Sequence, residues 1–99
     1  MITRIRTWTA LPGKGFELVA VLKEISATAA RISGLPQSAV PVSVGGDLGE
    51  ASLIISAESV DQSDENIAKI IAHPEFAPLI GKLTPLVEGG GFEQIYRHV

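Results

Sequence analysis

The order in which two hydrophobic periodicities follow one another constrains the fold of this chain most strongly. Stretches rich in β-branched and aromatic residues, typical of strands, lie at residues 2–10, 40–44, 51–57 and 92–99. Stretches with apolar residues three or four positions apart, typical of amphipathic helices, lie at residues 13–32 and 64–87. This β-α-β-β-α-β order predicts a ferredoxin-like α+β fold, with both helices on one face of a four-stranded antiparallel sheet. At 99 residues the chain is long enough for one such domain, spanning 1–99.

Turn residues define the end of the first helix and the course of the second strand. Gly34 and Pro36 stand where a helix cap and a stop are expected, so residues 35–39 should form a loop. Pro41 has no N–H to donate to a neighbouring strand, which predicts that the second strand lies at an edge of the sheet. The glycine-rich segment 45–49 should then turn the chain into the third strand as a hairpin.

The second helix carries its own start, break and end signals. Ser63 is placed to cap it. The acidic residues after Ser63 would interact favourably with the positive end of the helix dipole. Pro74, directly after His73, interrupts the helical pattern, so we predict a break or kink there. Three glycines at 89–91 should end the helix and release the chain into the last strand.

A sheet with both helices on one face leaves its other face without a cover. We place Thr3, Ile5 and Thr7 on the helix side of the first strand. The open face then receives Ile2, Arg4, Arg6 and Trp8. The third strand is apolar or small on both faces, as in a strand buried on both sides. Because monomers rarely expose so large an apolar patch, we predict a homodimer through the open sheet face.

Composition and net charge limit the classes of partner and the cellular location that we expect for the protein. The formal net charge is -3 and the pI is near 5.2, which is contrary to the basic footprint of a nucleic-acid or anionic-membrane binder, so we expect neither partner. The chain has no cysteine, which excludes disulfides and thiolate metal ligands. It has no apolar run of about 18 residues that would span a membrane. We therefore expect a cytoplasmic protein.

Several short sequences carry a family resemblance. Leu-Pro-Gly-Lys-Gly at 11–15, followed by Leu-Lys-Glu at 22–24, resembles the start of antibiotic-biosynthesis-monooxygenase-type domains. Ala-His-Pro-Glu-Phe at 72–76 and Leu-Thr-Pro-Leu at 83–86 are similar to the second helix of the same superfamily and of NIPSNAP-like domains. The resemblance covers nearly the whole chain. It implies a dimeric α/β barrel, in which two ferredoxin-like protomers pack sheet to sheet and each holds a ligand cavity between its sheet and second helix.

Three classes of function follow from this resemblance. The first is a small-molecule enzyme of the cofactor-free oxygenase-like type, acting on an aromatic or polyketide-like substrate with neither cofactor nor metal. The second is a non-catalytic small-molecule-binding or sensor domain, and the third is a structural or partner-binding module. Fold alone does not choose between them. The choice depends on whether a pocket exists and which titratable groups converge in it.

The candidate site lies between the sheet and the broken second helix. We assign catalytic roles to His73, Arg6 and Tyr96, and ligand-binding roles to Trp8, Phe76 and Arg4. An imidazole exchanges protons near neutral pH, and a guanidinium beside an aromatic ring binds planar anions. Together these residues predict a site for a planar anion, with Arg6 supplying charge and His73 moving a proton.

Structural roles compete with these assignments. His73 can instead fix the helix break, and Tyr96 can be a packing residue. The two arginines can pair across the sheet with Glu93 or Glu58. His98 is next to the end of the chain, which favours a solvent or dimer contact. The glycine clusters fit turns, because neither matches a phosphate-binding motif, and the histidine spacing matches no metal motif.

Overall fold

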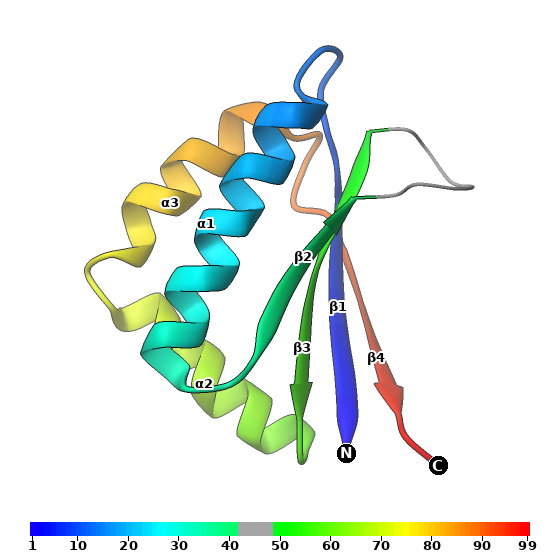
Figure 1. The fold of residues 1–99 in the computed structure, drawn as a ribbon, viewed down its shortest axis with the longest axis vertical. Coiled ribbons are helices and arrows are strands. Elements are labelled where there is room, and N and C mark those ends of the chain that lie inside the picture. Colours follow the sequence, from blue (N-terminus) through cyan, green and yellow to red (C-terminus); the bar gives the residue numbers. More distant parts are fainter. Residues whose placement is uncertain (42–48) are drawn as a thin grey trace.

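The structure, a computed structural model, describes residues 1–41 and 49–99 and has the predicted order of elements. The strands run over Ile2–Thr9 (β1), Gln37–Pro41 (β2), Glu50–Ala57 (β3) and Phe92–Arg97 (β4). The helices run over Gly15–Ser33 (α1), Val60–Ala72 (α2) and Phe76–Leu83 (α3), and a 3-10 turn follows at Thr84–Leu86. All three helices lie on one face of the sheet (Figure 1), which is the ferredoxin-like α+β arrangement.

The sheet has the strand order β2-β3-β1-β4, and every neighbouring pair is antiparallel. β1 therefore lies between β3 and β4, with Ile5 opposite Ile54 on one side and Gln94 on the other. The two ends of the chain lie side by side at one end of the sheet (Figure 1), where the N–H of His98 donates to the carbonyl of Met1 at 3.0 Å.

α1 supplies the centre of the hydrophobic core. Its apolar residues recur every three or four positions, and Leu18 and Leu22 on that stripe are fully buried. They belong to one cluster with Trp8 of β1 and Leu83 of α3. The helix ends as predicted at Gly34, whose φ of 75° is the left-handed conformation that closes a helix and favours glycine.

The predicted break in the second helix is confirmed, and it separates α2 from α3. Pro74 disfavours a helical conformation in the residue before it, and His73 is extended, with φ -76° and ψ 135°. The N–H of Glu75 donates to Nδ1 of the His73 ring at 3.2 Å, and the N–H of Phe76 donates to the His73 carbonyl at 3.0 Å. His73 therefore holds the turn between the two helices.

α2 begins one turn earlier than predicted. Ser59 is the N-cap, and its Oγ accepts a hydrogen bond from the N–H of Gln62 at 3.1 Å. Ser63, the predicted cap, lies inside the helix, where it is fully buried and donates to the carbonyl of Val60 at 2.8 Å. Both serines precede acidic residues, so the local sequence supports either start; burial of Ser63 beneath the sheet decides between them.

β2 also begins earlier than predicted. The prediction of a loop at 35–39 is wrong from Gln37 onward. Gln37 already pairs with Ile55 of β3, and this pairing holds it in an extended conformation. The edge position predicted from Pro41 is confirmed. Residues 42–48, predicted to continue this strand and turn the chain, lie outside the described residues.

The predicted facing of β1 is wrong. The residues that we assigned to the open face point toward the helices in the structure; they are Ile2, Arg4, Arg6 and Trp8. Thr3, Ile5 and Thr7 lie on the open face, where the hydroxyls of Thr7 and Ser52 are hydrogen-bonded at 2.7 Å. Both phases of the strand contain isoleucine, so alternation alone does not fix the phase. The helix layer fixes it by burying Ile2 and Trp8 to 5% and 8% exposure.

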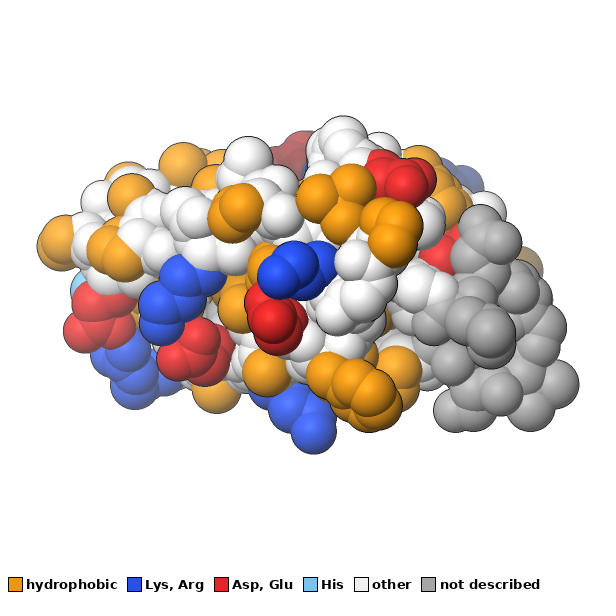
Figure 2. Space-filling view, turned by 90° about the horizontal axis from the view of Figure 1, so that it is seen from above, with side chains coloured by type: hydrophobic (Ala, Val, Ile, Leu, Met, Phe, Trp, Pro, Cys, Tyr) orange, Lys and Arg blue, Asp and Glu red, His pale blue; other side chains and the backbone are white. Residues whose placement is uncertain are grey.

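The surface mixes charges of both signs. On the face drawn in Figure 2, acidic and basic side chains lie beside one another with hydrophobic ones between them. Ion pairs at the surface of the structure include Lys14 with Glu17 at 3.7 Å and Lys82 with Glu24 at 3.4 Å. That face has no concentrated basic area of the kind that binds nucleic acid. Within the described residues, no helix is both long enough and apolar enough to cross a membrane.

Candidate functional site

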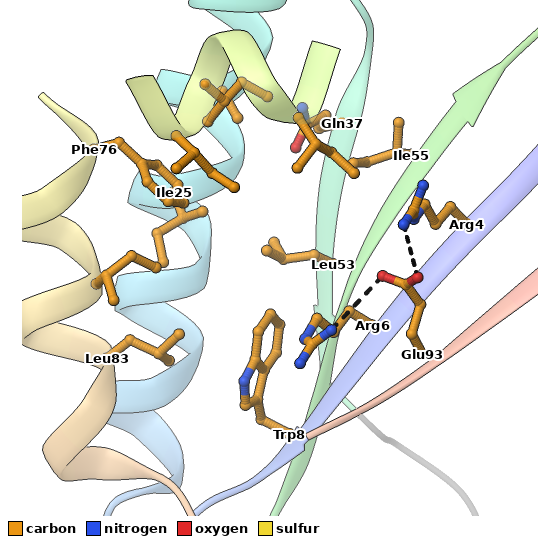
Figure 3. A pocket seen from close by; sticks show the side chains of 15 residues that line it. Arg4, Arg6, Trp8, Ile25, Gln37, Leu53, Ile55, Phe76, Leu83 and Glu93 are labelled. Carbon is orange, nitrogen blue, oxygen red and sulfur yellow. Dashed lines mark ion pairs between the residues drawn. The ribbon is translucent and has the colours of Figure 1, made fainter. Parts of the chain in front are cut away.

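A cavity of about 400 Å³ lies between the sheet and the helix layer (Figure 3). Its helix wall is apolar and is formed by Ile25 and Ala29 of α1, Ile67, Ile70 and Ile71 of α2, and Phe76, Ile80 and Leu83 of α3. Its sheet wall consists of Trp8, Leu53 and Ile55, with Gln37 beside them. The charged residues that line it are Arg4, Arg6 and Glu93. The cavity is therefore an apolar space with one charged side.

Strand geometry places these charged groups together. Successive residues of a strand point to opposite faces, so Arg4, Arg6 and Trp8 of β1 all face the helices. The register of β1 with β4 sets Glu93 directly opposite Arg6. Side chains of neighbouring strands on one face lie within reach of one another. Two guanidinium groups thus meet one carboxylate at the side of the cavity nearest β4.

Arg6 lies against Trp8 and the loop that precedes β4. Its guanidinium carbon is 5.7 Å from the centroid of the Trp8 ring, a cation–π distance. Its Nη2 donates to the carbonyl of Gly90 at 2.6 Å. Gly91 has φ 75°, and a Cβ there would clash with the carbonyl oxygen of Thr7 and approach the Trp8 ring to 3.0 Å. The glycines of this loop therefore act as turn residues, as predicted, and let it pass close to β1.

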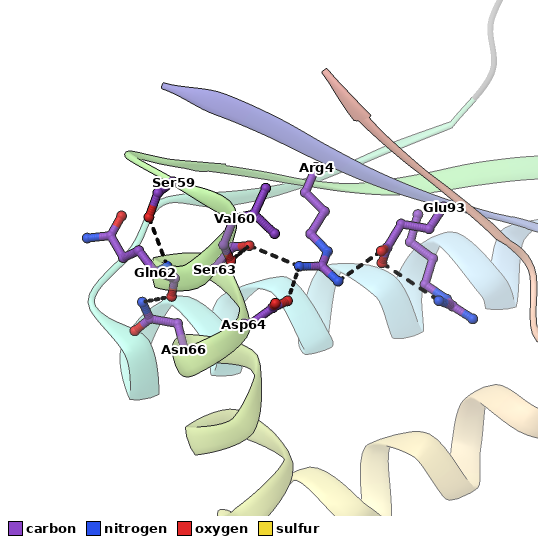
Figure 4. A network of polar contacts seen from close by, with 9 residues as sticks. Arg4, Ser59, Val60, Gln62, Ser63, Asp64, Asn66 and Glu93 are labelled. Atoms are coloured by element: carbon purple, nitrogen blue, oxygen red, sulfur yellow. Dashed lines mark hydrogen bonds and ion pairs between the residues drawn. The ribbon is translucent and has the colours of Figure 1, made fainter. Parts of the chain in front are cut away.

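Arg4 joins three elements of the fold (Figure 4). Its Nη1 donates to Oγ of Ser63 at 2.9 Å and to the carboxylate of Asp64 at 2.6 Å, both in α2. Its Nη2 pairs with the Glu93 carboxylate of β4 at 2.9 Å. The hydrogen bond with Glu93 raises the pKa of Arg4 above its usual value; burial opposes this, and Asp64 adds to it. Arg4 is thus a permanently charged link between β1, α2 and β4.

Glu93 divides its carboxylate between the two arginines. One oxygen is 2.9 Å from Nη2 of Arg4, and the other is 3.7 Å from Nη1 of Arg6. The ion-pair interpretation of the arginines is therefore confirmed for Glu93. Glu58, the other partner considered, lies before α2, where its N–H donates to the side-chain oxygen of Gln62 at 2.8 Å.

The structure brings together four of the residues predicted for the site. Arg4, Arg6, Trp8 and Phe76 all line the cavity, between the sheet and the broken helix as expected. The positions predicted for His73 and Tyr96 are wrong, because neither is among the lining residues. His73 holds the break between α2 and α3. Tyr96 pairs with Thr3 on the open face, half exposed and across the sheet from Trp8.

Apart from Phe76, the apolar helix wall is absent from the predicted site. Its isoleucine and leucine stripe is interpreted from the sequence as core, since apolar residues at helical spacing normally pack against a sheet. The signal for a cavity is the break at Pro74, which divides the stripe between α2 and α3. No three His, Asp or Glu side chains in residues 1–41 and 49–99 are grouped to hold a metal ion.

Comparison with known proteins finds similar structures. No protein-family model matches the sequence, and no curated protein matches it. An uncharacterized NIPSNAP domain protein from Burkholderia xenovorans matches with a TM-score of 0.84 at 12% identity, over 100% of this chain and 95% of that one. A NIPSNAP family protein from Agrobacterium tumefaciens matches with a TM-score of 0.82 at 22% identity, over 99% of this chain and 92% of that one. SnoaB, a cofactor-independent oxygenase from Streptomyces nogalater, matches with a TM-score of 0.70 at 17% identity, over 99% of this chain and 92% of that one.

The chain therefore has the fold of NIPSNAP domain proteins and of SnoaB. This confirms the resemblance predicted from the segments at the helix boundaries. At such identities the likeness establishes the fold, and the function has to be argued from the residues of the cavity itself.

Proposed function

We propose that the protein binds a small, planar, largely apolar molecule of aromatic or polyketide-like type in the cavity between the sheet and the helices. The observation that carries this proposal is the cavity: about 400 Å³, walled by aliphatic side chains, with Trp8 on the sheet and Phe76 on α3. Small-molecule sites are typically apolar spaces of about 300–1,000 Å³ with a few placed polar groups. This cavity fits that description.

The distribution of polar groups predicts the shape of the ligand. An apolar ring gains free energy by leaving water for the aliphatic helix wall. The guanidinium and carboxylate groups of Arg4, Arg6 and Glu93 lie along one side only, so they would orient a ligand that has oxygen substituents at one end. The proposed ligand is therefore a flat molecule with an apolar and a polar end.

The binding proposal is tested with anthraquinone-2-carboxamide as a planar, uncharged probe. Trp8 is the only tryptophan of the chain and lines the cavity, so its fluorescence reports the position of a bound quinone. We expect saturable quenching of the Trp8 emission. Replacement Ala29→Leu, which adds three carbons at a buried cavity position of α1, should weaken binding at least severalfold. Ala68→Leu, at an exposed position of α2, is the matched control. Equal affinity in both variants would place the ligand elsewhere.

Turnover without a cofactor is the second candidate function. It is favoured by the fold that the chain shares with the cofactor-independent oxygenase SnoaB. The guanidinium groups at the polar side of the cavity would also stabilise the anion of a deprotonated hydroxyaromatic substrate. An oxygen electrode with 2-naphthol as substrate separates the two functions. Uptake above the uncatalysed rate that Ala29→Leu abolishes would indicate an oxygenase; saturable binding without uptake would indicate a binding protein.

The proposed assembly is a homodimer through the face of the sheet that the helices leave uncovered. Trp8 and Ile2 do not contribute to it, because both are buried under the helices. The apolar residues of that face are Ile5, Val40, Ile54, Phe92 and Tyr96, of which Val40, Phe92 and Tyr96 are 40%, 52% and 49% exposed. Every residue of β4 is exposed as well. Covering this face with a second copy would remove these side chains from water.

Analytical ultracentrifugation of Ile54→Lys tests this assembly. Ile54 is central on the open face, opposite Ile5, so a charge there should dissociate a sheet-to-sheet dimer. Ala68→Lys places the same charge on the exposed surface of α2 and should leave the dimer intact. A wild-type protein that sediments as a monomer at micromolar concentration would contradict the proposal.

A further inference from the structure

The two arginines of the cavity are held in different ways. Arg4 is bound by Ser63, Asp64 and Glu93, and its side chain is 15% exposed. Arg6 is 44% exposed, and within the described residues its one hydrogen bond is the one to Gly90. Its distance to Glu93, 3.7 Å, is an ion pair without a hydrogen bond. Arg6 therefore keeps donor groups available to a ligand, while Arg4 does not.

The position of Glu93 adds a second observation. The Nε of Arg4 is buried and has no hydrogen-bond partner among the described residues. On a guanidinium, Nε and Nη2 lie along one edge, and a carboxylate binds such an edge best with both oxygens. One oxygen of Glu93 is already 2.9 Å from Nη2, while the other is directed toward Arg6. The bidentate pair is thus half formed, because the second oxygen of Glu93 lies toward Arg6 and Nε has no partner.

We propose that Glu93 is a displaceable counter-ion, and that the cavity selects aromatic acids carrying a single negative charge. The carboxylate of the ligand takes the place of Glu93 on Arg6, with its ring system against Trp8 and the helix wall. Glu93 then closes with both oxygens on Nη2 and Nε of Arg4. The exchange gives Arg6 the carboxylate of the ligand, leaves Arg4 with Asp64 and Glu93, and satisfies the buried Nε of Arg4, and no proton moves. This proposal rests on the proposed ligand cavity and specifies the charge of its ligand.

The test compares anthraquinone-2-carboxylate with the uncharged anthraquinone-2-carboxamide by quenching of the Trp8 emission at neutral pH. The wild-type protein should bind the carboxylate more tightly. Glu93→Gln removes the competing charge, so it should raise the affinity for the carboxylate by about three- to tenfold and change the affinity for the carboxamide much less. Arg6→Gln should lower the affinity for the carboxylate by about tenfold or more, and that for the carboxamide much less. Glu88→Gln, an exposed residue, makes the same change in net charge and serves as the control.

A separate measurement follows the movement of Glu93. In ¹⁵N-labelled protein, the Nε–H resonance of Arg4 should shift downfield when anthraquinone-2-carboxylate is added, because it gains a carboxylate acceptor. The carboxamide should not shift it, and neither probe should shift it in Glu93→Gln.

The outcomes distinguish this inference from the proposed function. Binding of both probes with no gain for the carboxylate in Glu93→Gln, or with the same gain in Glu88→Gln, would overturn the inference and leave the cavity proposal standing. An unchanged Arg4 Nε–H resonance would overturn the counter-ion exchange. Failure of both probes to bind any variant would overturn the cavity proposal and this inference together.

Discussion

Replacing Arg4 by methionine tests how much the link between β1, α2 and β4 stabilises the fold. Methionine keeps an unbranched side chain beneath the helices but removes the guanidinium. The pair with Asp64, whose side chain is 58% exposed, contributes less than about 1 kcal/mol. The bonds to Ser63 and Glu93 are better buried, and hydrogen bonds to charged groups contribute about 1.5–3 kcal/mol each.

Two costs reduce this contribution. Burying the guanidinium has a desolvation penalty, and the unpartnered Nε costs about 1–3 kcal/mol. We therefore expect Arg4→Met to lower the free energy of unfolding by about 2 kcal/mol. Arg4→Lys keeps the charge but lacks the planar fork that reaches three acceptors, so it should restore less than half of the loss.

The measurement is equilibrium unfolding in urea, followed by the emission of Trp8, which lies on the same strand. Ser63→Ala, alone and combined with Arg4→Met, isolates the interaction between these two residues as a double-mutant cycle. A free energy of unfolding for Arg4→Met within about 0.5 kcal/mol of the wild type would refute the reasoning. It would show that desolvation cancels all three bonds, as happens for some buried ion pairs.

Further changes test the loop, the core and the helix break. Gly91→Ala should destabilise the fold by about 3 kcal/mol or more in urea unfolding, since it combines positive φ with a clash, while Gly15→Ala, where a methyl group meets nothing, should not. Leu22→Ala should cost about 2–5 kcal/mol in the same assay; a loss under 1 kcal/mol would contradict its full burial. The hydrogen bond from Arg31 lowers the pKa of Glu75, so stability from this pair is lost as pH falls through that pKa. In an NMR titration Arg31→Gln should raise the pKa of Glu75, and an unchanged value would exclude the pair.

The order of elements is predictable because each depends on local periodicity. The stripe containing Leu18 and Leu22, the stop at Gly34 and the break at Pro74 are all encoded by neighbours in sequence. Which residues of β1 face the helices does not follow from local periodicity. Ile5 on one face and Trp8 on the other make both phases apolar, and the choice depends on helices that are distant in sequence.

The candidate site is predictable where side chains share a strand face. Arg4, Arg6 and Trp8 stay together whichever face they take, because alternate residues of one strand always point the same way. Tyr96 is on another strand, so its face depends on the register with β1, which sequence does not specify. His73 has the chemistry of a catalytic group, but the backbone geometry before Pro74 commits its ring to the turn.

The central position of β1 sets the order in which the cavity is completed during synthesis. β1 leaves the ribosome before the other strands, and β4 leaves after them; Arg6 and Gly90, which one hydrogen bond joins, are 84 positions apart. Contacts between such distant segments form more slowly than helices do. The nascent chain can therefore build α1, α2 and α3 against β1 and β3 while the side of the cavity that holds Glu93 is still missing. β4 adds Glu93 and completes the charged side, so a ligand that depends on these charges would bind only after β4 has joined the sheet.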